Sequence, residues 1–255
     1  MAQVILLGTG AALSDETREH TYLVIQGQAS AILIDCGGGP GQRLTKAGVA
    51  LDSIDHVILT HHHPDHLYGI SVFLLGLWLS GRKKVLHIHG LPETLRATRA
   101  IMRAHEWEQW MKVGFFPIEF HEVSRNAISL QIVTTEFSIS TTTTEHLLPT
   151  IATRVVSRQS GKSVVYSSDT EVCESVVELA RGVDILFHEA TTMNRAVMGH
   201  SSAAQAGAQA KRAGVKKLVL VHLPPNGDDE KIHAVAAKSF GGRTVVGKDF
   251  ARFKF

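Results

Sequence analysis

Short apolar runs separated by polar or glycine-containing turns make up most of the chain. Runs such as 4–7, 31–34 and 56–60 are largely apolar along their length, which is typical of strands buried on both faces. Longer segments with capping signals predict helices. The predicted strands cover 4–7, 21–25, 31–34, 56–60, 85–89, 118–120, 128–134, 137–141, 151–156, 164–168, 184–187, 217–221 and 244–246. The predicted helices cover 42–47, 67–79, 92–105, 172–180, 202–213 and 228–239.

The order of these elements predicts an α+β protein with four layers. Two β-rich blocks are each followed by helices, and this pattern favours two mixed sheets packed face to face with helices outside, an αββα sandwich. No Pro/Ser/Gly-rich tract, low-complexity run or charge block divides the 255 residues. We therefore expect a single domain over residues 1–255.

Composition limits the environment and the partners of the protein. A formal net charge of +2 argues against a large field for nucleic-acid binding, although it permits a local basic face. Two cysteines, Cys36 and Cys173, are too few for a disulfide framework and fit a reducing compartment. The N-terminus lacks a positively charged region, and the apolar segment 67–79 is too short to span a bilayer and indicates a buried helix. We expect a cytoplasmic protein without membrane association.

The chemistry of the chain is concentrated in one heptapeptide, Thr60–His66, at the end of a buried strand. Alternate strand residues point the same way, so His61 and His63 can bind one ion. Pro64 cannot continue a hydrogen-bond ladder and can turn Asp65 and His66 toward a second ion. Imidazole and carboxylate groups at this spacing predict two divalent metal ions in one site. We expect His62 to be a bystander.

Other candidate ligands lie at the ends of later strands. His146 lies between two of them, Asp169 follows the strand 164–168, and His222 follows the strand 217–221. A single histidine between strands is more often structural, and Asp169 is either a ligand or the N-cap of the next helix. Their shared position at strand ends favours a common site, because such ends can meet along one edge of a sandwich.

Three further motifs have two interpretations each. Asp35, before Cys36 and Gly37, is either a ligand or a carboxylate that accepts turn N–H groups or orients a ligand histidine. The Gly8-Thr9-Gly10 turn lacks the third glycine and the helix of a dinucleotide site, so we expect only a turn. His87 and His89 alternate on a strand, but no carboxylate or histidine follows at ligand spacing, so we expect ordinary polar side chains.

The order His-x-His-x-Asp-His after an apolar strand resembles the signature of the metallo-β-lactamase-fold hydrolases. Within them the sequence is most similar to the ribonuclease Z (tRNA 3′-end endonuclease) branch. The similar motifs run from the first strand to residue 222. They are Leu7-Gly8-Thr9-Gly10, Asp35-Cys36-Gly37, Thr60–His66, His146 with Pro149, Ser168-Asp169-Thr170, His188-Glu189-Ala190-Thr191, Gly199-His200-Ser201 and Leu218–His222.

The resemblance implies a dinuclear hydrolase and assigns a role to each matching residue. It implies one metal held by His61, His63 and His146, a second held by Asp65, His66 and His222, and a bridge formed by Asp169. Zinc is the implied metal, and manganese or iron suit the same ligands. Two such ions lower the pKa of a shared water toward ~7, so that hydroxide can attack phosphorus. Asp65 would orient this water, and His200, paired with Glu189, would protonate the leaving oxygen; a purely structural Glu–His pair is the alternative.

Two departures from the ribonuclease Z pattern leave the substrate open. Some ribonuclease Z enzymes have a flexible arm that binds tRNA. The arm is inserted between the positions of His146 and Asp169, where this chain has two predicted strands. After His222, a Ser-Arg-Tyr-like run is replaced by Leu223-Pro224-Pro225. The sequence therefore predicts a phosphodiesterase acting on RNA or, alternatively, on a small cyclic or diester phosphate. A lactone or β-lactam hydrolase is a further alternative, in which a Glu189–His200 acid would be superfluous.

An aromatic cluster bears on the oligomeric state. Trp107, Trp110, Phe115 and Phe116 lie in one connection and predict core packing or a dimer contact more than a substrate pocket. A homodimer is compatible with this pattern.

Overall fold

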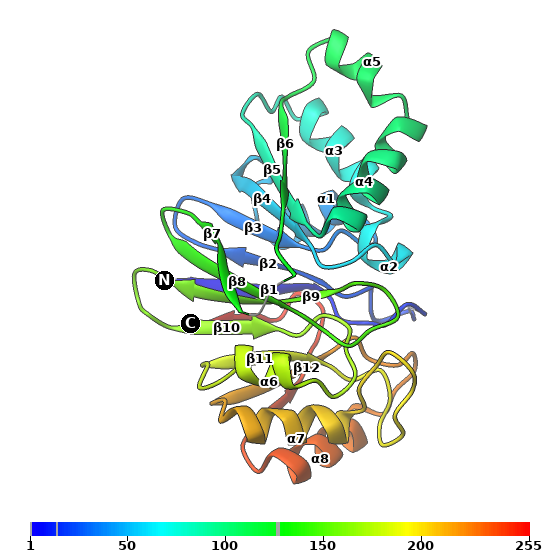
Figure 1. The fold of residues 1–255 in the computed structure, drawn as a ribbon. Helices are drawn as coiled ribbons and strands as arrows, with labels where there is room; N and C mark the ends of the chain where they lie inside the picture. Colours follow the sequence, from blue (N-terminus) through cyan, green and yellow to red (C-terminus); the bar gives the residue numbers. More distant parts are fainter. Residues whose placement is uncertain (1, 14, 126–127) are drawn as a thin grey trace.

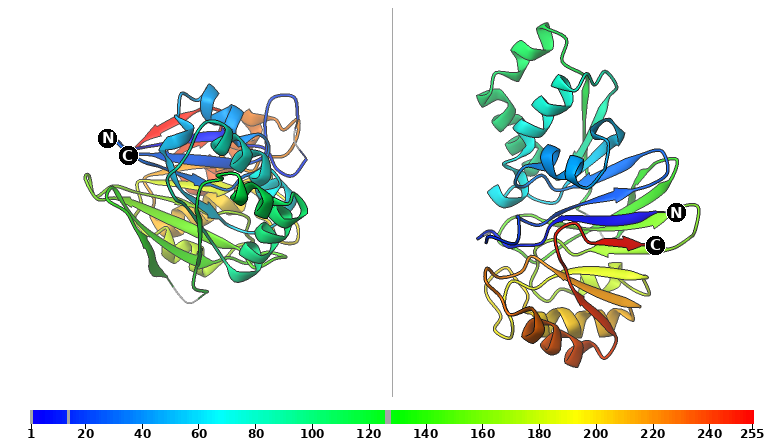
Figure 2. Two further views of the ribbon diagram at one scale, coloured as in Figure 1. Left: turned by 90° about the horizontal axis from the view of Figure 1, so that it is seen from above. Right: turned by 180° about the vertical axis from the view of Figure 1, so that it is seen from behind.

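Two seven-stranded mixed sheets lie face to face, and helices cover both outer faces (Figure 1). This is seen in a computed structural model, which describes residues 2–13, 15–125 and 128–255. The arrangement confirms the predicted α+β class and the αββα sandwich. Figure 2 shows the same layers from above and from behind.

The first sheet contains the N-terminal half of the chain and its last strand. In spatial order its strands are β14 (Arg252–Lys254), β1 (Gln3–Gly8), β2 (Tyr22–Gln26), β3 (Ala31–Ile34), β4 (Ile54–Leu59), β5 (Leu86–Gly90) and β6 (Ile118–Glu122). Its outer face carries α1 (Pro40–Lys46), α3 (Ile70–Leu79), α4 (Pro92–Ala104) and α5 (Trp107–Lys112), with the short α2 (Pro64–Leu67) and η1 (Leu51–Ser53) in its connections. Strands β3 to β6 are parallel.

The second sheet contains the rest of the chain. In spatial order its strands are β13 (Arg243–Val246), β12 (Lys217–Val221), β11 (Ile185–Glu189), β10 (Ser163–Tyr166), β9 (Ile151–Ser157), β8 (Phe137–Thr143) and β7 (Ser129–Val133). Helices α6 (Glu174–Leu179), α7 (Ala203–Ala213) and α8 (Asp229–Phe240) cover its outer face. Strands β10 to β13 are parallel, so their carboxyl ends lie at one edge.

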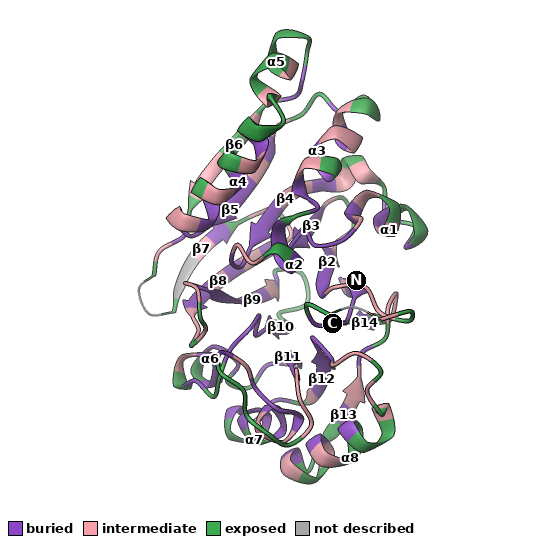
Figure 3. Cartoon of the chain, turned by 90° about the vertical axis from the view of Figure 1, so that its right-hand side faces the viewer, coloured by how far each residue is buried: buried purple, intermediate pink, exposed green. Residues whose placement is uncertain are grey.

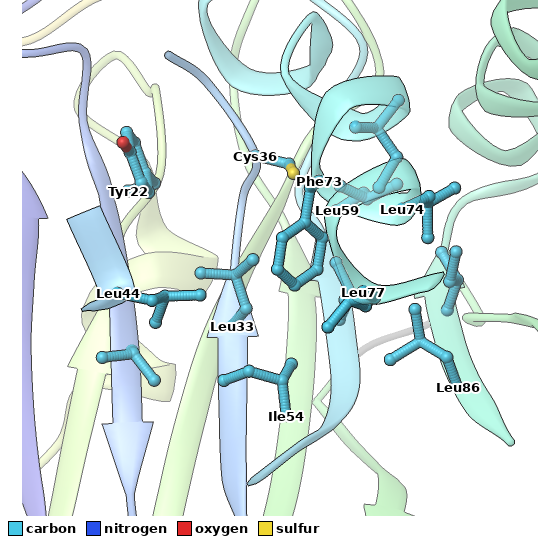
Figure 4. Close-up of a cluster of buried hydrophobic side chains, with 14 of the residues drawn as sticks. Tyr22, Leu33, Cys36, Leu44, Ile54, Leu59, Phe73, Leu74, Leu77 and Leu86 are labelled. Carbon is cyan, nitrogen blue, oxygen red and sulfur yellow. The ribbon is translucent and has the colours of Figure 1, made fainter. Parts of the chain in front are cut away.

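Three apolar layers stabilise the sandwich, and they explain why the strands are apolar on both faces. In β4, Val57 and Leu59 pack toward the helices of the first sheet, whereas Ile58 packs between the sheets. Figure 4 shows the first layer, where Phe73 and Leu77 of α3 lie with Leu59. The strands are mostly buried, whereas the outer helix faces are exposed (Figure 3).

The apolar segment 67–79 is not one buried helix as predicted. It is divided at Tyr68 and Gly69 into the end of α2 and the whole of α3. One side of α3 is also open, because Val72 is 68% exposed and Leu79 is 74% exposed. The division lets α2 carry its side chains toward the carboxyl end of β4 while α3 packs over the sheet. Among the described residues, no helix is both long enough and apolar enough to cross a membrane.

A glycine turn brings the first sheet close to the end of β4. A Cβ on Gly37 would lie 2.0 Å from the carbonyl oxygen of Asp65, so a larger residue would displace one of the two backbones. Next to it, Cys36 N donates to the carbonyl of His66 at 2.7 Å. The glycine therefore lets the backbone pass close beneath the histidine-rich loop.

Replacing Phe187 by alanine should destabilise the protein strongly. The ring is buried between the sheets and meets Phe253 edge-on at 5.3 Å, so truncation leaves a cavity costing about 3–5 kcal/mol. Denaturant unfolding of the metal-free protein measures this loss. Val72→Ala on the exposed side of α3 is the control and should change stability by less than about 0.5 kcal/mol; similar losses in both variants would contradict the assigned core.

Candidate metal centre

The histidine-rich loop begins where β4 ends and continues into α2. His63 is the N-cap of α2 and Pro64 its first residue, a position that suits a residue without an N–H. The strand already ends at Leu59, so Pro64 does not terminate it as predicted; Pro64 begins α2 and places Asp65 and His66 in the first helical turn. Both of these side chains are buried.

A first group of ligand-type atoms forms around His63. Its Nδ1 lies 3.0 Å from His61 Nε2 and 3.0 Å from His146 Nε2. Asp169 Oδ2 lies 3.8 Å from His61 Nε2 and 3.8 Å from His146 Nε2. The four residues could hold one metal ion, since all their ligand atoms lie within 4.8 Å of one another.

A second group lies beside the first. Asp65 Oδ2 lies 3.4 Å from His66 Nε2 and 3.5 Å from His222 Nε2. Asp169 Oδ2 also reaches these histidines, at 3.4 and 3.5 Å respectively. Asp169 thus contacts both groups, which is the position of a bridging carboxylate.

Asp169 does not cap the following helix. Cys173 is the N-cap of α6, which begins at Glu174 and therefore later than predicted. The Asp169 side chain is 2% exposed and has histidine neighbours from both sheets. The structure therefore favours the ligand interpretation over the capping one.

Buried hydrogen bonds orient the histidine rings from behind. His66 Nδ1 donates to Asp35 Oδ2 at 2.8 Å, and the same carboxylate accepts from the Thr60 N–H at 2.8 Å and the Thr60 hydroxyl at 2.9 Å. Asp35 therefore orients His66, a candidate ligand, which corresponds to one of its two predicted roles. His146 Nδ1 donates to the Gly199 carbonyl at 2.6 Å, which leaves its Nε2 with a free lone pair.

Thr191 is a supporting residue whose role was not predicted from the sequence. Its Oγ1 lies 2.8 Å from His222 Nδ1 and donates to Glu189 Oε2 at 2.8 Å. It therefore fixes the ring of His222 and the carboxylate of Glu189 together. Its membership of the His188-Glu189-Ala190-Thr191 motif was the available signal, but a threonine in a turn has too many ordinary roles to be singled out.

The backbone is strained where several of these side chains are held. Asp35, Ser168 and His222 have positive φ angles of 64°, 53° and 52°, which non-glycine residues rarely adopt. Each lies at the end of a strand. Such conformations persist only where the surroundings hold them, and they cluster at functional sites.

Burial and the neighbouring histidines shift the pKa of the Asp169 carboxyl in opposite directions. Burial disfavours the charged form of Asp169, but the neighbouring His222 and His66 outweigh it and hold its pKa well below the usual value. Burial likewise lowers the pKa of His61 well below its ordinary value, so this imidazole is neutral. A charged carboxylate and a neutral imidazole are the protonation states that bind divalent metals.

The donor set fits bound cations. His66 Nε2, His222 Nε2 and Asp169 Oδ1 are buried without a hydrogen-bond partner. Unpaired buried polar atoms are costly, and all three belong to the two ligand groups. Nitrogen and oxygen donors of this kind suit zinc, manganese or iron.

Glu189 and His200 form the predicted pair at the edge of the second sheet. His200 Nδ1 lies 3.0 Å from Glu189 Oε1, and the Glu189 carboxylate is fully buried. Burial alone would lower the pKa of His200, but the hydrogen bond to Glu189 outweighs it and raises the pKa. The imidazole also lies 3.9 Å from Asp169 and stacks on His222, so the pair adjoins the ligand groups.

Other candidates lie outside these groups. His62 belongs to no ligand cluster among the described residues. Gly10 lies in a turn whose neighbour Ala11 donates to the Leu223 carbonyl at 2.9 Å, which joins the two sheets beside His222. The role of the turn is therefore structural, as expected. The aromatic side chains at 107–116 pack with the first apolar layer, in keeping with the core packing that the sequence favoured.

Two basic segments of the sequence, 82–84 and 211–217, are possible contacts for RNA phosphates, but several of their charges are paired with carboxylates. Arg82 is buried and lies 3.3 Å from Asp52, and Lys84 lies 2.7 Å from Asp55. In the second cluster, Lys216 lies 2.8 Å from Asp184. The segments 82–84 and 211–217 are therefore weak candidates for phosphate binding.

A four-layer αββα sandwich with His and Asp clusters at its strand ends defines a metal-dependent hydrolase of the metallo-β-lactamase fold. Two solved structures share this fold over nearly the full length of both chains. YhfI from Bacillus subtilis has a TM-score of 0.83 at 22% identity, covering 99% of this chain and 98% of its own. Human tRNase Z, short form, has a TM-score of 0.80 at 23% identity, with the same coverage.

The chain belongs to the ribonuclease Z-like family of these hydrolases. It is 31% identical over 284 residues to ribonuclease Z of Mycobacterium bovis (strain BCG / Pasteur 1173P2), covering 99% of this chain and 98% of that protein. The profile of a family described as Anti-Pycsar protein Apyc1 also matches, over residues 2–241. The ribonuclease Z relatives support a metal-dependent phosphodiesterase.

Replacing His66 by alanine should reduce the metal content of the purified protein by about one ion per chain, because its Nε2 completes the second ligand group. The variant should also unfold at a lower temperature, since metal binding is linked to folding. Elemental analysis and thermal unfolding measure the two effects. His62→Ala, in the same loop, is the control and should keep its metal; equal losses in both variants would refute the assignment.

Proposed function

We propose that the protein is a dinuclear phosphodiesterase that cleaves RNA in the manner of ribonuclease Z. One observation carries the proposal: a buried Glu189–His200 pair adjoins two ligand groups that share the carboxylate of Asp169. A protonated imidazole is useful where a poor leaving group such as an alkoxide must accept a proton. Ring opening of a β-lactam or lactone does not require one at this position.

The ligand residues would act by binding and orienting. Two bound ions, most simply zinc, would lower the pKa of a water molecule and neutralise charge on a phosphate. Asp65, at 10% side-chain exposure, is more open than Asp169 at 2%, so Asp65 is the carboxylate that a water molecule can reach. We assign to Asp65 the orientation of the attacking water through a hydrogen bond to its carboxylate.

His200 would supply the proton for the leaving oxygen. Its Nδ1 is bound to Glu189 Oε1, so Nε2 is the ring atom that can present a proton to substrate. Glu189 is itself held by the N–H of Thr170 at 2.8 Å and by the Thr191 hydroxyl at 2.8 Å. The carboxylate therefore cannot swing away and keeps the imidazole oriented.

A small cyclic or diester phosphate is a second candidate substrate. The segment between His146 and Asp169 forms β9 and β10 of the second sheet and carries no arm. The alignment with the mycobacterial relative spans 284 residues, more than the 255 of this chain, so that relative has segments absent here. A protein without an arm must bind RNA through surfaces of the sandwich itself, whereas a small phosphate ester can bind at the metal centre alone.

Replacing His200 by alanine should slow hydrolysis of a substrate with an alkoxide leaving group by roughly 10²–10⁴-fold, the usual range for general acid catalysis. Hydrolysis of bis(p-nitrophenyl) phosphate, whose leaving group needs no proton, should fall much less. Measured kcat values on the two substrates give the contrast. Metal content should be unchanged, and equal losses on both substrates would assign the pair a structural role.

The metal-loaded protein should cleave precursor tRNA at the 3′ end of the acceptor stem. A parallel assay with a nucleoside cyclic phosphate, a lactone and a β-lactam tests this choice. Turnover of the cyclic phosphate without cleavage of tRNA would establish the second candidate. Activity confined to the lactone or the β-lactam would overturn the phosphodiesterase proposal.

A further inference from the structure

Another cluster of histidines lies within strands β5 and β6 of the first sheet. In β5, Leu86 and Ile88 pack toward the helices, so His87 and His89 project from the opposite face. In β6, Ile118 and Phe120 pack toward the helices in the same way. Glu119 and His121 therefore project from the same face as the two histidines of β5.

The register of the strands brings these side chains together. In the parallel pair β5–β6, His87 lies opposite Glu119 and His89 opposite His121. His87 Nδ1 lies 3.0 Å from His121 Nε2 and 3.3 Å from a Glu119 oxygen, Oε2. The same oxygen lies 3.6 Å from His121 Nε2. Three ligand-type atoms thus form a nearly equilateral triangle.

The triangle has the size of one face of a tetrahedral metal site. Ligands about 2.0–2.1 Å from a tetrahedral ion lie roughly 3.3–3.4 Å from one another, and the three edges here bracket that value. The approach of the two imidazole nitrogens also equals the 3.0 Å between His61 Nε2 and His63 Nδ1 in the candidate metal centre. Two imidazoles and a carboxylate are a common donor set for zinc and its neighbours.

We propose that His87, Glu119 and His121 form an additional binding site for a transition-metal ion that favours imidazole, such as zinc. The site shares no residue with the two ligand groups at the strand ends. Its side chains are 31%, 55% and 41% exposed, respectively, so an ion can enter from solvent and keep water at its fourth position. The alternation of His87 and His89 was visible in the sequence, but the partners of His87 come from a strand some thirty residues later, so ordinary polar side chains were expected.

A bound ion would tie the edge of the sheet together. Within the first sheet β6 pairs only with β5 and carries α5 before it in the chain (Figure 1). Behind the triangle, His89 stacks on His121 and hydrogen-bonds His56 of β4, Nε2 to Nδ1, at 3.0 Å. These neighbours limit the movement of the His121 ring. The ion would therefore hold β6 to β5, a strand that is itself joined to β4 by the hydrogen bond between His89 and His56.

Zinc titration of the metal-free full-length protein, followed by calorimetry, tests the proposal. Wild-type protein should bind one more zinc ion than His121→Ala, and Glu119→Gln should weaken that extra site. His105→Ala, which removes an exposed histidine outside every ligand group, is the matched control and should bind as wild type does. The extra ion should remain in His66→Ala, which separates this proposal from the one for the strand-end centre.

Hydrogen exchange supplies a second measurement. Zinc should slow amide exchange in β6 of the wild-type protein and of His66→Ala, but not of His121→Ala. Equal zinc stoichiometry in wild type and His121→Ala, or protection of β6 that persists in His121→Ala, would overturn the proposal.

Discussion

The carboxylate of Asp169 is the point on which the rest of the site depends. A single oxygen of this buried side chain lies 3.4–3.8 Å from ring nitrogens of four histidines, two from the loop after β4 and two from the second half of the chain. A buried negative charge is unfavourable unless other charges and dipoles compensate it. Here the compensation comes from both sheets, so their relative position and the geometry of the centre are determined together.

Hydrogen bonds to the histidine rings, on the side that faces away from the centre, explain why the protein tolerates so many buried polar residues. Asp35 accepts three hydrogen bonds from Thr60 and His66, and Thr191 joins His222 to Glu189. His66, His146 and His222 therefore each have one ring nitrogen hydrogen-bonded from behind and the other directed at the centre. Three unpaired atoms of the centre, His66 Nε2, His222 Nε2 and Asp169 Oδ1, lie where a cation would bind. Metal binding at this centre would therefore be coupled to folding, because without a cation these groups are desolvated and unpaired.

The two histidine clusters differ in burial, and they therefore differ in how strongly their side chains depend on being paired. At the strand ends, burial removes water from the side chains and makes their pairing essential. On the face of β5 and β6 the side chains are partly exposed, and water can satisfy them when no ion is present. The first cluster therefore bears on the stability of the whole sandwich, whereas the second bears on one sheet edge. The segment between His146 and Asp169 carries no arm, so a substrate at the strand-end centre would be held by the sandwich itself.

The sequence by itself determined the layered fold and the ligand-type residues of the candidate centre. Apolar runs report burial directly, and His, Asp and Pro at short spacing within Thr60–His66 report local geometry. Tertiary structure alone decided that Asp169 faces the histidines instead of capping α6, and that Asp35 orients His66. It also decided that the segment 67–79 breaks into two helices and that His87 meets Glu119 and His121. These outcomes depend on strand register and on side-chain direction between distant segments, and neither leaves a periodic signal along the chain.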